Sequence, residues 1–138
     1  TEGHRSVAPP YDPEYSTIAR DLEEISRDME MSRSIWLMHS PPYQSLLDRA
    51  GLDGLMVDHV PLDVHVGSIA IRRFIEDKQP WITLHGHIHE SSRITGAWQD
   101  ALGSTRMFSA AWDGPELALV RFHPNHPSNA SRELLPTH

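Results

Sequence analysis

The chain has 138 residues, of which 38% are hydrophobic, and its 11 prolines and 8 glycines are typical of one loop-rich domain. Nineteen acidic against twelve basic residues give a net charge of −7, which argues against general binding to nucleic-acid backbones. The absence of cysteine excludes disulfides, thiolate metal sites and cysteine nucleophiles, and no apolar segment is long enough to predict a membrane span. We therefore expect a soluble, cytoplasmic protein with no membrane partner.

The first third of the chain predicts one helix and one strand. Residues 1–14 are rich in proline and predict an irregular entry segment; because the chain starts at Thr1, we expect it to begin inside a longer product. Apolar residues recur at helical spacing over Tyr15–Met31, which predicts an amphipathic helix. The apolar run Ser34–Met38 predicts a strand, which must stop before the Pro41-Pro42 pair.

The remainder predicts a second helix followed by several strands. Residues 43–66 predict a long surface connection with a weakly helical piece near Ser45–Ala50. The pattern then predicts a helix over Ser68–Lys78, strands over Trp81–His85, Arg93–Trp98, Thr105–Ala110 and Leu117–Phe122, and a loose tail over 124–138. The folded part of the chain is thus expected to span 15–123.

Histidines follow both of the stronger predicted strands, at His39 and in the segment 85–89. In open α/β sheets, ligands bind just beyond the carboxyl ends of the strands. Residues two apart in an extended segment project to one side, roughly 6.5–7 Å apart. We therefore expect His87 and His89 to point into one cleft and to reach two metal ions about 3.5–4 Å apart. Gly86 is expected to let the backbone turn close to a bound ion.

Two motifs carry a resemblance to a known family. His39-Ser40-Pro41-Pro42 followed by Gly86-His87-Ile88-His89-Glu90 resembles the last two signatures of the calcineurin-like metallophosphoesterases. The resemblance spans about 34–98, roughly half of the chain. It implies an α/β fold, namely the carboxy-terminal half of a four-layer α/β/β/α sandwich with a mixed sheet flanked by helices.

The resemblance also implies an activity and a set of ligands. The family hydrolyses phosphate monoesters or diesters by attack of a hydroxide that bridges two divalent transition-metal ions. Carried over by position, His39 and His87 belong to one metal and His89 to the other, and imidazole suits manganese, zinc or iron. Glu90 and His85 are candidates to support these ligands, and His65 is a candidate to face the substrate.

The motifs that this family places upstream are not found before His39. An Asp-x-His strand end, a Gly-Asp pair and an Asn-His-Asp/Glu turn would supply the bridging carboxylate, an asparagine ligand and the histidine that protonates the leaving group. The catalytic proton donor is therefore unknown, and we expect this chain alone to be inactive. We expect it to pair with its missing amino-terminal half or with a second copy, because half of such a sandwich exposes its inner face.

Two other functions fit parts of the pattern. Some proteins of this fold mainly bind partner proteins and have a degenerate metal site. A simple histidine-rich metal-binding module would explain the ten histidines but not the two prolines after His39.

Overall fold

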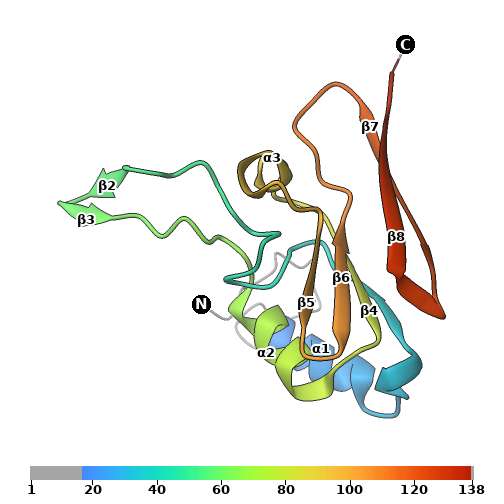
Figure 1. The fold of residues 1–138 in the computed structure, drawn as a ribbon. Helices are drawn as coiled ribbons and strands as arrows, with labels where there is room; N and C mark the ends of the chain where they lie inside the picture. Colours follow the sequence, from blue (N-terminus) through green and yellow to red (C-terminus); the bar gives the residue numbers. More distant parts are fainter. Residues whose placement is uncertain (1–16, 138) are drawn as a thin grey trace, which may run out of the picture.

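The computed structural model describes residues 17–137, which form a mixed α/β arrangement (Figure 1). The helices and strands are α1 (Ile18–Ser26), β1 (Ile35–Leu37), β2 (Met56–Val57), β3 (Val60–Pro61), α2 (Ile69–Lys78), β4 (Ile82–His85), α3 (Ser91–Thr95), β5 (Gln99–Leu102), β6 (Thr105–Ser109), β7 (Leu117–His123) and β8 (His126–Leu135). The expected entry segment 1–14 lies outside the described residues.

A four-stranded mixed sheet holds the structure together. Its strand order is β1-β4-β6-β5; β1, β4 and β6 are parallel, and β5 is antiparallel to β6. Trp36, Thr83 and Met107 are register partners and so share one face, while Leu37, Leu84 and Phe108 share the other. Because the three parallel strands run the same way, their carboxyl ends meet at one edge of the sheet.

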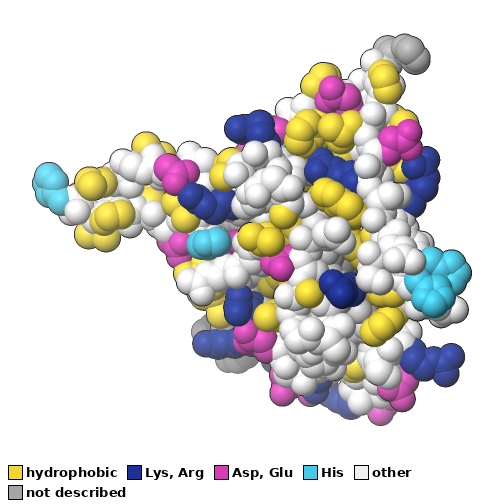
Figure 2. Space-filling view, viewed as in Figure 1, with side chains coloured by type: hydrophobic (Ala, Val, Ile, Leu, Met, Phe, Trp, Pro, Cys, Tyr) yellow, Lys and Arg dark blue, Asp and Glu magenta, His cyan; other side chains and the backbone are white. Residues whose placement is uncertain are grey.

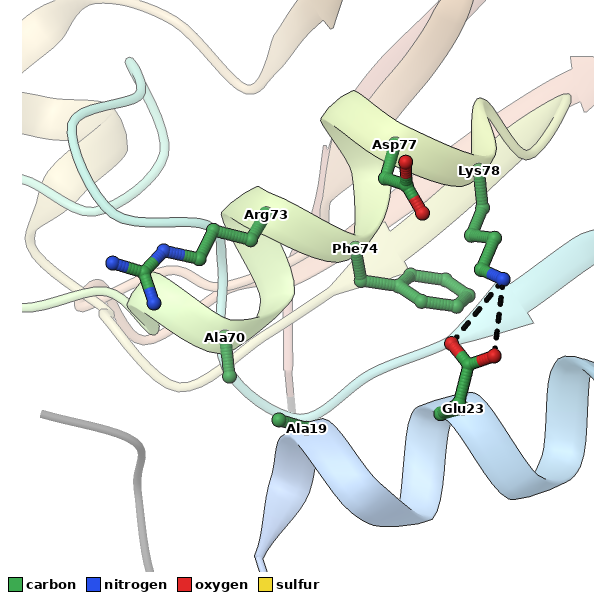
Figure 3. Close-up of a pocket in the computed structure, with 7 residues that line it drawn as sticks. All are labelled: Ala19, Glu23, Ala70, Arg73, Phe74, Asp77 and Lys78. Atoms are coloured by element: carbon green, nitrogen blue, oxygen red, sulfur yellow. Dashed lines mark hydrogen bonds and ion pairs between the residues drawn. The ribbon is translucent and has the colours of Figure 1, made fainter.

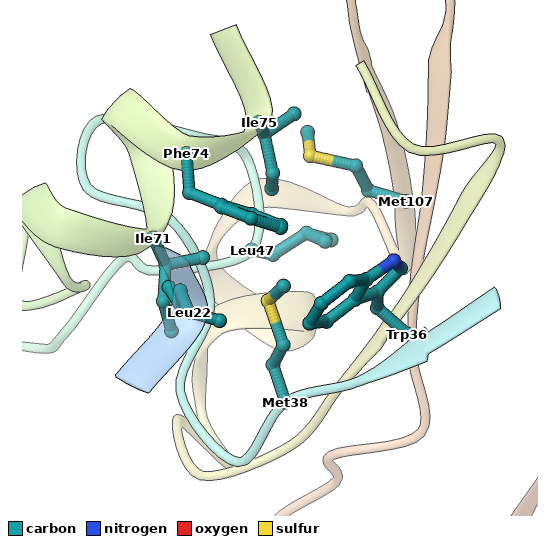
Figure 4. Packing of buried hydrophobic residues seen from close by; sticks show 8 residues of the cluster. All are labelled: Leu22, Trp36, Met38, Leu47, Ile71, Phe74, Ile75 and Met107. Atoms are coloured by element: carbon teal, nitrogen blue, oxygen red, sulfur yellow. The ribbon is translucent and has the colours of Figure 1, made fainter. Parts of the chain in front are cut away.

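The first face of the sheet forms the core with α1 and α2. Trp36 packs edge-on against Phe74 with ring centroids 4.8 Å apart, and Ile75 is fully buried. Figure 4 shows these helix and strand side chains converging. The cluster comprises Leu22, Trp36, Met38, Leu47, Ile71, Phe74, Ile75 and Met107.

Helix α2 agrees with the sequence prediction, whereas helix α1 is shorter than predicted. Helix α2 begins at its predicted cap, where the Ser68 hydroxyl accepts a hydrogen bond from the Ile71 N–H, and it ends at Lys78 as expected. Helix α1 is capped by Thr17 but ends at Ser26, so the predicted extension to Met31 is wrong. Ile25, one of the apolar residues that recur at helical spacing, is 61% exposed, and a 3-10 turn over Met31–Arg33 leads into β1.

The carboxy-terminal part corrects two predictions. The expected strand over 93–98 is wrong, because Ser91–Thr95 form α3, which ends at Gly96 with φ +74°, and the strand begins only at Gln99. The expected loose tail is also wrong, because β8 is a ten-residue strand that pairs antiparallel with β7. The β7–β8 ribbon lies beside the four-stranded sheet (Figure 1). On the second face of the sheet, Phe122 stacks on Phe108 with centroids 5.2 Å apart.

The connection between β1 and α2 contains a hairpin that the sequence did not predict. Strands β2 and β3 project from the body of the protein, and the turn residues Asp58 and His59 both have positive φ, as in a tight hairpin turn (Figure 1). The predicted helical piece near 45–50 is wrong, because these residues form turns. Apolar side chains cover the hairpin in the space-filling view (Figure 2), and its exposed large apolar residues are Leu55, Met56, Val57, Val60 and Leu62.

Part of the second sheet face and the β1 edge remain open. Leu37 is 80% exposed and Ile35 is 41% exposed, although both lie in a strand of the central sheet. Among residues 17–137, β1 pairs only with β4, so its other edge has no strand partner. No helix among the described residues is long and apolar enough to cross a bilayer.

Candidate functional site

The two histidine-bearing turns lie side by side because β1 and β4 are adjacent and parallel. The ladder continues past β1, where the Met38 N–H donates to the Leu84 carbonyl at 2.9 Å. One step further, the Gly86 N–H donates to the His39 carbonyl at 3.1 Å. The backbone hydrogen bonds therefore fix both turns at the carboxyl edge of the sheet.

The imidazoles of His39 and His87 meet at this edge. Their ring centroids are 4.6 Å apart, the ring planes are inclined by 53°, and both residues are exposed. Two imidazoles that bind one ion tetrahedrally, each with a metal–nitrogen distance of 2.0–2.1 Å, have centroids roughly 5 Å apart. The observed spacing thus fits two ligands of a single ion.

His87 itself adopts an unusual backbone conformation. Its φ is +72°, and the Ile88 N–H donates to the Gly86 carbonyl at 2.9 Å, which closes a three-residue γ-turn around the histidine. A positive φ is costly for a residue with a side chain. The expected extended geometry of 86–89 is therefore wrong, and the position that requires a left-handed backbone is His87 rather than Gly86.

Among the described residues nothing requires a glycine at position 86, and the expected close approach to a bound ion stays a prediction. A Cβ at this position would lie 3.7 Å from the His39 carbonyl oxygen, which is an ordinary contact, and its φ is not positive. The glycine that is required lies elsewhere: a Cβ at Gly67 would lie 2.6 Å from the Pro42 carbonyl oxygen and 2.8 Å from the Asp48 Cβ.

His89 and Glu90 lie just beyond this turn. His89 is exposed, and Glu90 occupies the position before α3, where its carbonyl accepts hydrogen bonds from the Arg93 and Ile94 N–H groups. Within residues 17–137, no three histidine, aspartate or glutamate side chains are close enough to hold one metal ion. Neither residue therefore joins His39 and His87 in one cluster, and His89 would have to serve a separate ion.

His85 is buried and both of its ring nitrogens are engaged. Nδ1 donates to the Ser40 carbonyl at 3.0 Å, and Nε2 accepts from the Thr83 hydroxyl at 2.8 Å. Burial lowers the pKa of His85 to about 4, against a smaller raising effect of the Ser40 carbonyl. The ring stays neutral and links β4 to the turn after His39, so it positions that turn and leaves no nitrogen free for a metal.

Asp48, which the sequence reading missed, organises the connection between β1 and α2. Its carboxylate is fully buried and accepts backbone N–H bonds from Gln44 at 2.8 Å, Ser45 at 3.0 Å and Gly67 at 3.0 Å. The fourth donor is Nδ1 of His65, at 2.7 Å. No local pattern distinguishes this aspartate from a solvated charge, because its donors lie as far as nineteen residues along the chain.

Tyr43 and Asp63 flank His65. The Tyr43 hydroxyl donates to Asp63 Oδ2, while Oδ1 accepts the His65 N–H at 2.9 Å. These bonds stabilise the charged carboxylate, so they lower the pKa of Asp63, and the bond to Asp63 raises the pKa of Tyr43. The Tyr43 ring faces the His65 ring edge-on, with centroids 6.2 Å apart.

A cavity of about 280 Å³ lies far from these histidines, between α1 and α2 (Figure 3). The Glu23 carboxylate and the Lys78 ammonium form an ion pair across it at 3.2 Å. Phe74 forms part of its wall, and no histidine lines it. It is a groove between two packed helices, and its two carboxylates, Glu23 and Asp77, are accompanied by the cations Arg73 and Lys78.

Comparisons with known proteins were made on the whole chain. No family model matches it, and no solved structure matches it. The uncharacterized protein MJ1162 of Methanocaldococcus jannaschii is 40% identical over 76 residues, which cover 53% of this chain and 29% of that protein. The chain therefore spans less than a third of the curated relative that it matches, and the relative's name states no activity.

Proposed function

We propose that this chain is the carboxy-terminal half of a calcineurin-like, binuclear metal-dependent phosphoesterase that hydrolyses phosphate monoesters or diesters. The observation that carries the proposal is the meeting of His39 and His87 at the carboxyl ends of two adjacent parallel strands, with ring centroids 4.6 Å apart. These are the two residues that the motif resemblance gives to one metal. The closeness of these two rings at one strand edge supports the proposal.

The backbone at His87 supports a functional role. A histidine held at φ +72° in a γ-turn carries strain that the surrounding structure has to offset. Strain of this kind clusters at active sites and ligand clamps. An exposed histidine that contributes nothing to the core gives no structural reason to keep this conformation, whereas orienting a metal ligand does.

The residues present fit part of a metal site. His39 and His87 would hold one ion, and His89 would contribute to a second; the remaining ligands would come from outside residues 17–137. When bound, such ions lower the pKa of water and stabilise charge on phosphoryl oxygens. The chain's own residues supply orientation, because His85 ties the His39 turn to β4 and α3 fixes the segment after His89.

The open parts of the sheet agree with an incomplete fold. The unpaired edge of β1 and the exposed Leu37 would be covered in a four-layer α/β/β/α sandwich, in which a second sheet and further strands complete the domain. The partner is then the missing amino-terminal half or a second copy of the chain. Alone, with two imidazoles for one ion, the chain would bind metal weakly and be a poor catalyst.

A second candidate function is a protein-interaction module of the same fold with a degenerate metal site. The projecting β2–β3 hairpin favours it, because Met56 and Val60 are 63% and 65% exposed on a ribbon that pairs with no further strand among the described residues. A hairpin of this size is marginally stable without a partner surface.

Metal-dependent hydrolysis by the full-length product separates the two candidates. Cleavage of bis(p-nitrophenyl) phosphate should require added manganese or zinc and should be lost in His87→Ala and His39→Ala. His126→Ala, which removes an exposed histidine on β8, is the matched control and should keep full activity. Activity that survives both site variants, or that needs no metal, would contradict the phosphoesterase and leave the interaction module.

A further inference from the structure

The connection between β1 and α2 is anchored to both histidine-bearing turns. Just after His39, Ser68 donates its N–H to the Pro41 carbonyl at 2.9 Å and accepts the Tyr43 N–H at 3.1 Å. Just after His89, the Ser91 hydroxyl donates to the Leu46 carbonyl and accepts the Arg49 N–H, both at 3.0 Å. The connection is therefore held at the same edge of the sheet as the candidate metal ligands.

Within this connection, the imidazole of His65 is held by its backbone pairing and by a side-chain hydrogen bond. His65 pairs with Arg49 in an isolated antiparallel bridge, which places it beside the segment bound to Ser91. Its Nδ1 donates to Asp48, a carboxylate with no exposed surface. Burying a carboxylate is costly unless its hydrogen bonds are satisfied, and here four donors satisfy it.

The bond to Asp48 also determines what the other ring nitrogen offers. Because a carboxylate only accepts, Nδ1 carries the proton, and in the neutral ring Nε2 presents a lone pair. Among residues 17–137, Nε2 has no hydrogen-bond partner, and the side chain is 30% exposed. The result is an oriented acceptor whose bridge partner, Arg49, is bonded to Ser91, two residues after His89.

We infer that His65 recognises the alcohol part of the substrate, accepting a hydrogen bond from one of its hydroxyl groups through Nε2. This inference rests on the proposed function, in which His39 and His87 hold the metal that binds the phosphoryl end. Asp48 is a positioning residue that fixes the ring. The substrate class is a phosphoester whose alcohol is a neutral polyol.

The charges around His65 favour a neutral alcohol, because the cation of its bridge partner Arg49 is already paired with Asp53 and does not offset the two carboxylates that bond to His65. Asp48 and Asp63 both bond to this residue, one through the ring and one through the backbone N–H. A second phosphate or a carboxylate on the alcohol would be repelled by these two carboxylates. Hydroxyl groups, in contrast, can donate to Nε2 and to the exposed carboxylate of Asp63.

Binding of two simple ligands tests the inference without requiring turnover. Glycerol 1-phosphate and methyl phosphate share the phosphoryl group, but only the first has free hydroxyls. In the presence of Zn²⁺, NMR titration of the full-length product should show glycerol 1-phosphate binding about five-fold more tightly, the range expected for one hydrogen bond. In His65→Phe this preference should vanish while the affinity for methyl phosphate stays unchanged.

Four further variants separate failure of the inference from failure of the proposed function. His59→Asn changes a histidine at the tip of the same connection and should keep the preference for glycerol 1-phosphate. Asparagine tolerates the positive φ of His59. Asp48→Asn should reduce it, because the ring is less firmly held. If the preference for glycerol 1-phosphate survives in His65→Phe, the inference is overturned while the proposed function stands. The same conclusion follows if His65→Phe and His65→Gln weaken the binding of both ligands equally. If neither ligand binds and His87→Ala changes nothing, the proposed function fails as well.

Discussion

Replacing His87 by glycine should stabilise the folded chain relative to replacing it by alanine. The comparison isolates the γ-turn, because both variants remove the same exposed imidazole and differ only in a Cβ at φ +72°. A left-handed backbone costs an L-residue roughly 1–2 kcal/mol, whereas glycine adopts it freely. Glycine loses more conformational entropy on folding, by roughly 0.5–1 kcal/mol.

The net effect is a free energy of unfolding about 1 kcal/mol higher for His87→Gly than for His87→Ala. Urea unfolding followed by tryptophan fluorescence measures it, since four tryptophans report on the chain. Thermal unfolding should show a difference of about 3–5 °C. Both variants should lose metal binding equally, because neither has the imidazole.

His126, on the exposed face of β8, provides the matched control. It has an ordinary negative φ, so there His126→Gly should be less stable than His126→Ala by roughly 0.5–1 kcal/mol. The two positions should therefore show opposite orders. Equal stability of the two His87 variants, or greater stability of His87→Ala, would refute the strained-turn argument.

Three further changes should alter stability in defined ways. His85 has a pKa of about 4 in the folded chain, whereas in the unfolded chain it takes up a proton below about pH 6.5. The free energy of unfolding should therefore fall by roughly 3 kcal/mol as the pH is lowered from about 6.5 to about 4. His85→Gln should flatten this dependence in pH-jump unfolding measurements. Asp48→Ala leaves three backbone N–H groups without their acceptor and should cost roughly 3–5 kcal/mol in urea unfolding; a loss below about 1 kcal/mol would contradict the bonding described. Gly67→Ala places a Cβ 2.6 Å from the Pro42 oxygen and should lower stability by about 3 kcal/mol, while Gly51→Ala, whose Cβ would make only an ordinary contact with Ile94 Cδ1 at 3.9 Å, should lower it less.

The elements that the sequence predicted correctly are those with a strong local signal. Helix α2 has a serine cap and a proline just beyond its end, and β1 and β4 are apolar runs stopped by proline or glycine turns. The adjacency of β1 and β4 then follows from parallel pairing, which is why His39 and His87 could be placed at one edge before the structure was known.

The failures share a different cause, namely dependence on tertiary contacts. Strand β8 is polar and rich in proline, serine and asparagine, and it is a strand because it pairs with β7. The γ-turn at His87 has no sequence signature, since the positive φ falls on histidine beside a glycine that does not need it. Asp48 could not be found because its partners are brought together only by folding.

The position of a bound metal tests the central claim most directly. Crystals of the chain soaked in Zn²⁺ or Mn²⁺ should give an anomalous peak about 2.0–2.3 Å from a ring nitrogen of both His39 and His87. That peak should be absent from crystals of His87→Gly soaked in the same way. A metal bound elsewhere with these two imidazoles unligated, or none at millimolar concentrations, would contradict the assignment of this strand edge as a metal site.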